Sequence, residues 1–398
     1  MQHEITRAIP LLDEKGNLTE AGYAKKLLPI YDRTKVKGGK SRLKEWDYYY
    51  VGNDQFGVAL TIDDNYLYGL DSVSFLWFED TPWQITKSPM RILPKGKTGL
   101  PASSVSGVTK TEGKGYFMKF EVTRKSRVLE VHMDDFKDGQ PIDIHIALIN
   151  EPEESLVVCT PFEKEAHFYY NQKINCMRAK GTVKIGDTVY KMEPDSSFGV
   201  LDWGRGVWTY HNTWYWGSAS GLVDGADFGF NIGYGFGDTS AASENMLFYK
   251  GKAHKLSQVT FNIPMKDGKE DYLSPWTFTS DDGRFEMDFA PVINRSALTD
   301  LKILVSDQNQ VFGRFSGTAV LDDGTKLEVK DLFGFEMISL NKFTTAQIDK
   351  NTWTKEMLDL LMDFIEKDDR AADYRGLDWS EEYDLAINGD PNDTQSAL

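Results

Sequence analysis

The chain has 398 residues, and its 45 basic and 61 acidic residues give a formal net charge of -16 at pH 7. A chain this acidic repels nucleic acid phosphates and anionic lipid headgroups, so we expect neither nucleic acid nor a membrane surface as a partner. Hydrophobic residues make up 40% of the chain, and this length allows a large core without a disulfide or a structural metal.

The beginning of the chain lacks the pattern of a signal peptide. Residues 1–16, MQHEITRAIPLLDEKG, contain neither a basic start nor a long apolar stretch, and a secretory signal requires both. No apolar run reaches the length of about 18 residues that a membrane-spanning helix needs. We therefore expect a cytoplasmic protein with no membrane span. Its two cysteines, Cys159 and Cys176, are then expected to be free thiols.

Short strands dominate the pattern along most of the chain. After a short helix expected at residues 19–28, residues 142–149 alternate apolar and polar side chains, as a half-buried strand does. Asp-Gly pairs favour tight hairpin turns, and they recur at 138–139, 267–268, 282–283 and 323–324. Residues 354–367 then place apolar residues on one helical face, with Thr354 as the N-cap. The pattern predicts an all-β fold with a C-terminal helix.

Two sets of similar features occur in the same order along the chain. The matching segments are 46–50 with 214–216, 56–60 with 228–232, and 171–188 with 309–325. Features that recur in one order at a long period indicate duplication. We predict four parts: an N-terminal extension (1–39), a first barrel (40–192), a second barrel (198–343), and a C-terminal helix with an acidic tail (344–398).

Residues 201–221 form the most distinctive segment, because four of the ten tryptophans fall within it. If residues 207–216 form one strand, its alternation places four aromatic side chains on one face: Trp208, Tyr210, Trp214 and Trp216. Two interpretations remain open. The segment is either the aromatic wall of a ligand cavity with Asp202, Arg205 and His211 at its mouth, or a large barrel core beside a surface salt bridge.

Five motifs of this chain resemble those of a known family. They are Gln2–Thr6 with Leu11–Asp13, Lys44–Tyr49, Asp202–Trp216, Phe230–Gly233 and Gln310–Gly317. Together they resemble the uncharacterised bacterial family named domain of unknown function 2804 (DUF2804), over residues 2 to 343. That family is distantly similar to the tandem lipocalin-like (calycin) barrels of the carotenoid 1,2-hydratase group, which includes fungal pericyclases. The resemblance implies a hydrophobic small molecule held in a barrel or in the groove between two barrels.

Candidate site residues come from these motifs and from the aromatic segment. The residues expected to carry chemistry are Asp202, Arg205, Tyr210 and His211. The residues expected to contact a ligand are Trp203, Trp208, Trp214, Trp216, Asn231, Gln310 and Arg314. Asp202 or His211 would move a proton, and Arg205 would hold Asp202 as a carboxylate or stabilise a developing anion.

The expected function is the binding of an apolar or amphipathic small molecule, with acid/base conversion of the hydratase, isomerase or cyclase kind. A non-catalytic carrier and a carbohydrate-active protein remain open as alternatives. The sequence contains no HExxH, HxH or CxxC motif, so we expect no metal. The glycine-rich stretch at 233–237 opens no expected helix, so we expect no nucleotide cofactor either.

Overall fold

The computed structural model describes residues 2–39, 42–66, 68–209, 211–300, 304–343, 355–367 and 374–379. In these ranges the chain forms two large antiparallel sheets, two small sheets, one 3-10 helix and one α-helix. The predicted all-β class with a C-terminal helix is therefore confirmed.

The first large sheet has the strand order β7-β6-β5-β4-β16-β14-β12-β11-β10-β9, with β2, β8, β13 and β15 pairing beside this path. Its strands are β2 (Gly22–Ala24), β4 (Leu43–Gly52), β5 (Phe56–Asp64), β6 (Tyr68–Trp77), β7 (Trp83–Lys87), β8 (Met90–Ile92), β9 (Gly107–Gly113), β10 (Tyr116–Val122), β11 (Arg127–Lys137), β12 (Gln140–Ile149), β13 (Leu156–Pro161), β14 (Phe168–Ile185), β15 (Thr188–Met192) and β16 (Phe198–Val207).

The second large sheet has the order β20-β19-β18-β17-β27-β26-β25-β24-β21. Its strands are β17 (His211–Val223), β18 (Ala226–Tyr234), β19 (Met246–Tyr249), β20 (Lys252–Lys255), β21 (Val259–Asn262), β24 (Trp276–Ser280), β25 (Phe285–Asp300), β26 (Leu304–Val320) and β27 (Lys326–Phe343). A hairpin of β22 (Met265–Lys266) and β23 (Lys269–Glu270) stands apart from it.

The two sheets repeat one topology. The path β7-β6-β5-β4-β16-β14-β12-β11-β10 corresponds strand by strand to β20-β19-β18-β17-β27-β26-β25-β24-β21. Gly181 of β14 and Gly317 of β26 have φ of 150° and 156°, and a Cβ on either would lie 2.1 Å from a carbonyl oxygen of the adjacent strand. The repeat predicted from the sequence is thus matched by the order of the strands and by a glycine at the equivalent position in each half.

The predicted pair of closed lipocalin-like barrels is not seen. Among the described strands, no ladder joins the two edges of either sheet. Each sheet instead curls around its own apolar core. Strand β16, which follows the predicted boundary at residues 193–197, pairs with β4 and β14 of the first sheet.

The side chains of each strand point alternately to the two faces of the sheet, so one strand contributes both to a core and to the opposite face. Ile142, Ile144, Ile146 and Leu148 of β12 are all buried in the first core, and the residues between them face outward. This is the pattern expected for a sheet with one covered face. The residue range 142–149 predicted as a strand lies within β12 and is confirmed.

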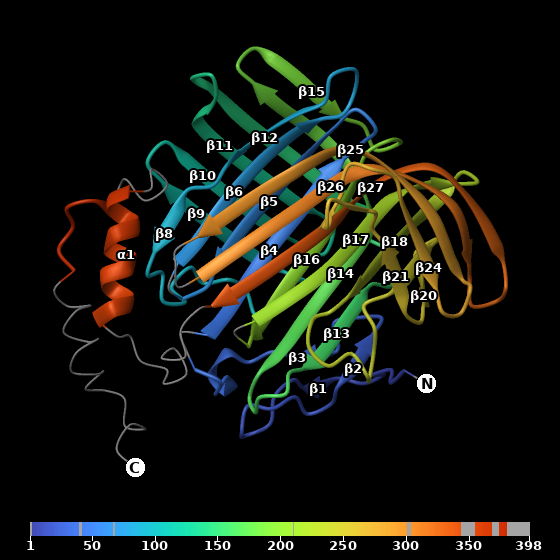
Figure 1. The fold of residues 1–398 in the computed structure, drawn as a ribbon, viewed down its shortest axis with the longest axis horizontal. Helices are drawn as coiled ribbons and strands as arrows, with labels where there is room; N and C mark the ends of the chain where they lie inside the picture. Colours follow the sequence, from blue (N-terminus) through green and yellow to red (C-terminus); the bar gives the residue numbers. More distant parts are fainter. Residues whose placement is uncertain are drawn as a thin grey trace.

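The second sheet packs across the first. In Figure 1, β25, β26 and β27 pass over the face formed by β4, β5 and β6. Ring pairs join the two sheets, with centroids 5.3 Å apart for Tyr50 and Phe312 and 4.3 Å apart for Phe78 and Phe333. These contacts belong to a separate apolar cluster between the sheets, so the sheets have a packed interface in addition to their own cores.

The ends of the described chain pack against the two sheets. Helix α1 (Lys355–Lys367) buries Phe364 and Ile365 against Met90 and Ile92 of β8, while its predicted N-cap, Thr354, lies outside the described residues. No described helix is long and apolar enough to cross a membrane. Cys159 and Cys176 are buried free thiols, as predicted.

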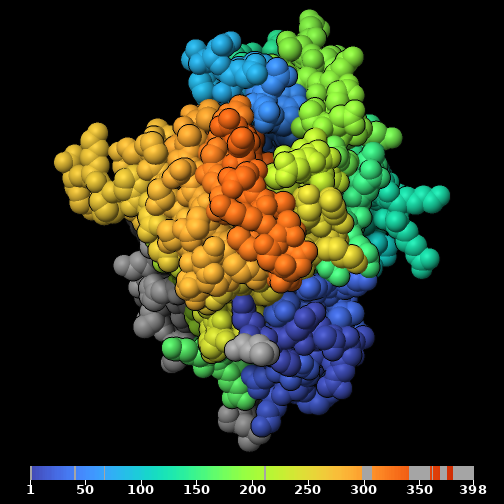
Figure 2. Space-filling view, turned by 90° about the vertical axis from the view of Figure 1, so that its right-hand side faces the viewer, coloured from blue at the N-terminus to red at the C-terminus, as the bar shows by residue number. Residues whose placement is uncertain are grey.

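The N-terminal segment contains β1 (Ile9–Pro10), β3 (Pro29–Ile30) and a 3-10 helix at Arg33–Lys35. The helix expected at residues 19–28 is wrong, because Gly22–Ala24 forms β2 and pairs with β13. The His3 amide donates to the Ala241 carbonyl at 2.8 Å, so this segment contacts the second half of the chain. Figure 2 shows it in blue beside the yellow and orange second half.

Candidate functional site

A cavity of about 470 Å³ lies between the two sheets. One wall comes from β4, β5, β6, β7, β14 and β16, and the other from β17, β25, β26, β27 and the segment after β18. Its lining includes aromatic rings, hydroxyl groups and six ionisable side chains other than tyrosine: Lys44, Asp63, Lys173, Asp202, Glu244 and Arg295. A cavity of this size with a few polar groups converging in it is typical of a small-molecule site.

Strand register aligns one row of polar groups along the first wall. Lys173 of β14 is paired with Asp202 of β16, Asp202 with Tyr48 of β4, Tyr48 with Thr61 of β5, and Thr61 with Ser72 of β6. All five side chains line the cavity. Directly opposed residues on adjacent strands project to the same face, so five separate segments supply one continuous polar row.

Glycines in the Asp202–Trp208 segment make room for indole rings on the cavity side. A Cβ on Gly204 would lie 1.9 Å from the Trp46 ring. A Cβ on Gly206 would lie 2.5 Å from the Phe168 carbonyl oxygen and 3.0 Å from the Trp208 indole nitrogen. Alternation places Asp202, Gly204 and Gly206 on the same face of β16. The motif therefore combines a cavity carboxylate with the open surface on which two tryptophans pack.

The predicted cluster of tryptophans forms, although it does not come from one strand. Strand β16 ends at Val207 and β17 begins at His211, so residues 207–216 do not form the single strand expected. Trp208 and Trp214 still meet with ring centroids 5.6 Å apart. Trp208, Trp214 and Trp216 all line the cavity, and Phe236 packs edge-on against the first two.

Asp202 forms an ion pair with Lys173. The Lys173 Nζ lies 2.9 Å from Asp202 Oδ2, and both side chains are largely buried, with 3% and 11% of their surface exposed. The Asn171 amide donates to the other carboxylate oxygen at 2.6 Å. The Lys173 ammonium also lies 3.9 Å from the ring centroid of Trp216, which belongs to the second sheet. The pair therefore joins the polar row to the aromatic wall.

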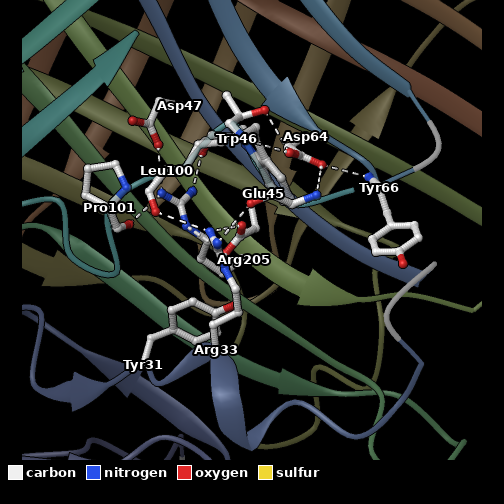
Figure 3. A network of polar contacts seen from close by, with 12 residues as sticks. Tyr31, Arg33, Glu45, Trp46, Asp47, Asp64, Tyr66, Leu100, Pro101 and Arg205 are labelled. Atoms are coloured by element: carbon white, nitrogen blue, oxygen red, sulfur yellow. Dashed lines mark hydrogen bonds and ion pairs between the residues drawn. The ribbon is translucent and has the colours of Figure 1, made fainter. Parts of the chain in front are cut away.

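Arg205 is not part of the cavity lining and lies in a separate network of polar contacts (Figure 3). Its side chain is fully buried, and its guanidinium donates to Asp47 Oδ1 at 3.1 Å and to the carbonyls of Trp46 and Pro101, each at 2.8 Å. Glu45 lies beside it, with Oε1 3.7 Å from its Nε. Because residues 202 and 205 lie on opposite faces of β16, the structure does not bring Asp202 and Arg205 together.

Glu244 brings a second carboxylate into the cavity from the segment between β18 and β19. It is 7% exposed, and its carboxylate has no hydrogen bond or ion pair to any described residue. Burial raises the pKa of this carboxyl to about 7, and the nearby Lys173 opposes the rise while Asp202 adds to it. Glu244 is therefore a carboxylic acid that gains and loses its proton near neutral pH.

Asn231 positions Glu244 and Trp216 relative to each other. Its side-chain oxygen accepts from the Trp216 indole N–H at 2.6 Å, and its amide donates to the backbone carbonyl of Glu244 at 2.6 Å. Asn231 is fully buried. The predicted ligand residue Asn231 thus lies behind the cavity wall and holds two of the groups that face the cavity.

A second charged cluster lines the cavity further along β4 and β5. Burial raises the pKa of Asp63 to about 7, although the Leu70 amide, 2.6 Å away, stabilises the carboxylate. Burial lowers the pKa of Lys44 to about 8, and Arg42 adds to the effect. The Lys44 Nζ lies 3.3 Å from the Asn65 side-chain oxygen. The cavity therefore contains groups at two places whose charge changes near neutral pH.

The remaining predicted residues have other surroundings. Gln310 donates to the Tyr48 hydroxyl at 2.9 Å, so it supports the polar row from the second sheet. Trp203 packs edge-on against Tyr170 in the first core. Arg314 is half-buried beside Asp54, 3.7 Å away, and is not part of the cavity lining. Tyr210 and the side chain of His211 lie outside the described residues.

Sequence reasoning missed Lys173, Glu244, Lys44 and Asp63. One local signal was present for Lys173, since it is a lysine within the buried strand run 168–177. Glu244 lies in an irregular segment between strands, where the alternation of side chains along a strand cannot predict which way a residue points. Its position in the cavity depends on how the second sheet packs on the first.

Comparisons with solved structures find similar chains at low identity. Kievitone hydratase from Nectria haematococca is 11% identical with a TM-score of 0.44, covering 85% of this chain and 99% of that chain. CghA with Sch210972 is 10% identical with a TM-score of 0.38, covering 84% and 98%. A putative AttH from Nitrosomonas europaea is 10% identical with a TM-score of 0.38, covering 75% and 92%. A comparison with curated proteins finds no match. The family model described as a domain of unknown function (DUF2804) matches residues 2–342.

Proposed function

Because this chain belongs to the DUF2804 family, whose description specifies no activity, we propose its function from the cavity: it binds an amphipathic small molecule between its two sheets and converts it by proton transfer. The observation that carries the proposal is the position of Glu244. This carboxyl is buried, has no described partner and lies in the same cavity as the Lys173–Asp202 pair and three tryptophans. A scaffold alone does not require a buried carboxyl without a partner, because leaving one unpaired costs stability.

Glu244 is the proposed acid/base residue. A carboxyl whose pKa lies near 7 can both accept and donate a proton at neutral pH, which is the optimum for general acid/base catalysis. In the simplest cycle, the carboxylate accepts a proton from a carbon of the ligand, and the electron pair delocalises into an adjacent unsaturated group. The carboxylic acid then returns the proton at a different carbon. The outcome is an isomerisation, and atoms and charge balance without a co-reactant.

Lys173 and Asp202 are the proposed positioning and charge-stabilising groups. The Lys173 ammonium is held by Asp202 and by the face of Trp216, so it can stabilise negative charge that develops on the ligand. Trp208 and Trp214 provide flat apolar surface for the body of the ligand. The same groups would serve a hydration or a ring closure, the other two reaction types expected from the sequence.

We also retain a lipocalin-like origin for the two sheets as a proposal. It is supported by the identical strand order of the two sheets and by their curvature around separate cores. In this proposal the ligand lies between the two halves, because the described cavity is lined by both.

The test is to extract small molecules from the purified protein and identify them by mass spectrometry, then to return each to fresh protein and analyse the products. An amphipathic molecule that is chemically changed supports the proposal. A molecule recovered unchanged indicates a carrier, and an oligosaccharide indicates a carbohydrate-active protein. Trp214→Ala serves as the matched variant, and it should reduce the amount of co-purified molecule if the cavity holds it.

A further inference from the structure

Arg295 projects from the second sheet onto the first sheet's wall of the cavity. It lies on β25 opposite Gln310 of β26, and its Nη1 donates to the Ser74 hydroxyl of β6 at 2.7 Å. Ser74 is fully buried and is itself hydrogen bonded to Thr86 at 2.8 Å. The guanidinium, which the second sheet carries, is therefore held by a buried hydroxyl of the first sheet.

The charges that line the cavity leave Arg295 without an acidic partner. Lys173 pairs with Asp202, and Asp63 interacts electrostatically with Lys44. In contrast, no carboxylate of the described residues forms an ion pair with Arg295, and the ionisable group that acts on it is the Tyr48 phenol. A guanidinium stays protonated even when desolvated, so this part of the cavity holds a fixed positive charge that lacks a counter-charge.

Hydroxyl groups surround the same part of the cavity. Thr61, Ser72, Thr86 and Ser88 line it together with Arg295, and Ser88 donates to Ser72 at 2.8 Å. Hydroxyl hydrogens can rotate toward an acceptor. A planar carboxylate matches the parallel donors of a guanidinium, and its single negative charge equals the charge of Arg295. A phosphate dianion would need a second uncommitted cation.

The aromatic and cationic parts of the cavity lie over different strands of the first sheet. Arg295 contacts β6 through Ser74, whereas Trp216 lies over β14 through Lys173. From this arrangement we propose that the molecule bound between the sheets is an amphipathic carboxylic acid, with its carboxylate on Arg295 and its apolar body against the tryptophans. This inference rests on the proposed function, because it names the class of molecule that the same cavity takes.

The test compares two probes that share one aromatic body. 1-Naphthaleneacetic acid carries a carboxylate, and 1-naphthaleneacetamide replaces it with a neutral amide. Titration calorimetry of the full chain at about pH 6 should show the acid binding about tenfold or more tighter than the amide, because a hydrogen-bonded charge is lost with the amide. At that pH Glu244 and Asp63 are mostly protonated, given pKa values of about 7, so they repel the probe little.

Variants of Arg295 test whether this residue causes the tighter binding of the acid. Arg295→Gln should bring the two dissociation constants together, and Arg295→Lys should retain part of the preference. Arg124→Gln removes the same charge from an exposed hairpin and should leave the preference unchanged. A preference that persists in Arg295→Gln overturns the assignment.

The wild-type comparison decides the ligand class even if the Arg295 variants fail to fold. Equal binding of both probes, or tighter binding of the amide, contradicts the carboxylic acid and leaves the proposed function standing. If neither probe binds, both the ligand class and the proposed cavity are contradicted.

Discussion

Lys173 and Asp202 lie directly opposite each other on β14 and β16, with the ammonium nitrogen 2.9 Å from a carboxylate oxygen and 3.9 Å from the ring centroid of Trp216. Each member of the pair neutralises a charge that would otherwise be nearly buried and alone. The indole that covers the pair comes from the opposite sheet. The pair is therefore a point at which electrostatics, sheet pairing and packing between the halves depend on one another.

Removing one member of this pair should destabilise the fold strongly. Lys173→Met leaves the Asp202 carboxylate without its cation, which should cost about 3 to 5 kcal/mol of unfolding free energy. The double variant Lys173→Met with Asp202→Asn removes both charges and should be more stable than Lys173→Met alone. Urea unfolding of the single and double variants measures this coupling. Additive losses would show that the two side chains contribute independently.

Glu244→Gln should abolish conversion of the bound molecule and preserve its binding. The amide keeps nearly the same shape but cannot transfer a proton at neutral pH. The measurement is deuterium uptake into the co-purified molecule when the protein is incubated in heavy water. Wild-type protein should catalyse uptake, with a rate that rises with pH toward 7 and levels above it, if the carboxylate is the base. Uptake at an undiminished rate in Glu244→Gln would assign the chemistry to another group.

Glu244 should also make stability depend on pH. Its pKa is raised from 4.5 to about 7 in the folded protein, so the folded state binds this proton more tightly than the unfolded state. The contribution of Glu244 to the stability of the fold is therefore most favourable below pH 4.5, and it falls as the pH rises to about 7. The difference in unfolding free energy between the wild type and Glu244→Gln should therefore change by about 3 kcal/mol across this pH range.

Urea unfolding at about pH 5 and pH 8 measures this change. Asp63 also has a raised pKa, but its effect cancels because it is present in both proteins. If the difference in unfolding free energy between the two proteins is the same at both pH values, the pKa of Glu244 is not raised in the folded state.

Gly204→Ala should displace the Trp46 indole, because the new methyl group would lie 1.9 Å from the present ring position. Overpacking of this kind costs about 1 to 3 kcal/mol, and binding of 1-naphthaleneacetamide should weaken because the cavity wall moves. Trp46→Leu in the same chain restores space and should recover part of the lost stability. Calorimetric melting of the wild type and of these two variants checks this, and a double variant less stable than Gly204→Ala would contradict the packing explanation.

Local alternation in the sequence predicted much of the structure. Period-two patterns in segments such as 142–149 identify strands because a covered sheet buries every second residue. The same reasoning grouped Trp208, Trp214 and Trp216, which all line the cavity, although Trp208 lies in the connection between β16 and β17 and not on a strand. The alternation argument was not applied to Arg205, because the glycines at 204 and 206 suggested a turn. In the structure, β16 continues through these residues. The alternation of that strand puts Arg205 in the first core.

The chemistry of the cavity could not be read in the same way. Lys173, Glu244 and Arg295 are separated by long stretches of chain, and they meet because β25 to β27 cross the face of the first sheet. No local pattern encodes that crossing. Asp202 was found because it lies beside tryptophans in the sequence, whereas its partner Lys173 was missed because the pairing of β14 with β16 is a tertiary feature.

The connection between β16 and β17 is short, since one strand ends at Val207 and the other begins at His211. Each side of this connection has its own core, but the walls of the cavity come from both sides. A molecule that binds between them would therefore contact both halves and add to the packed interface that already joins them. Ligand should raise the resistance of both halves to heat and protease together, because binding is linked to the assembled state alone.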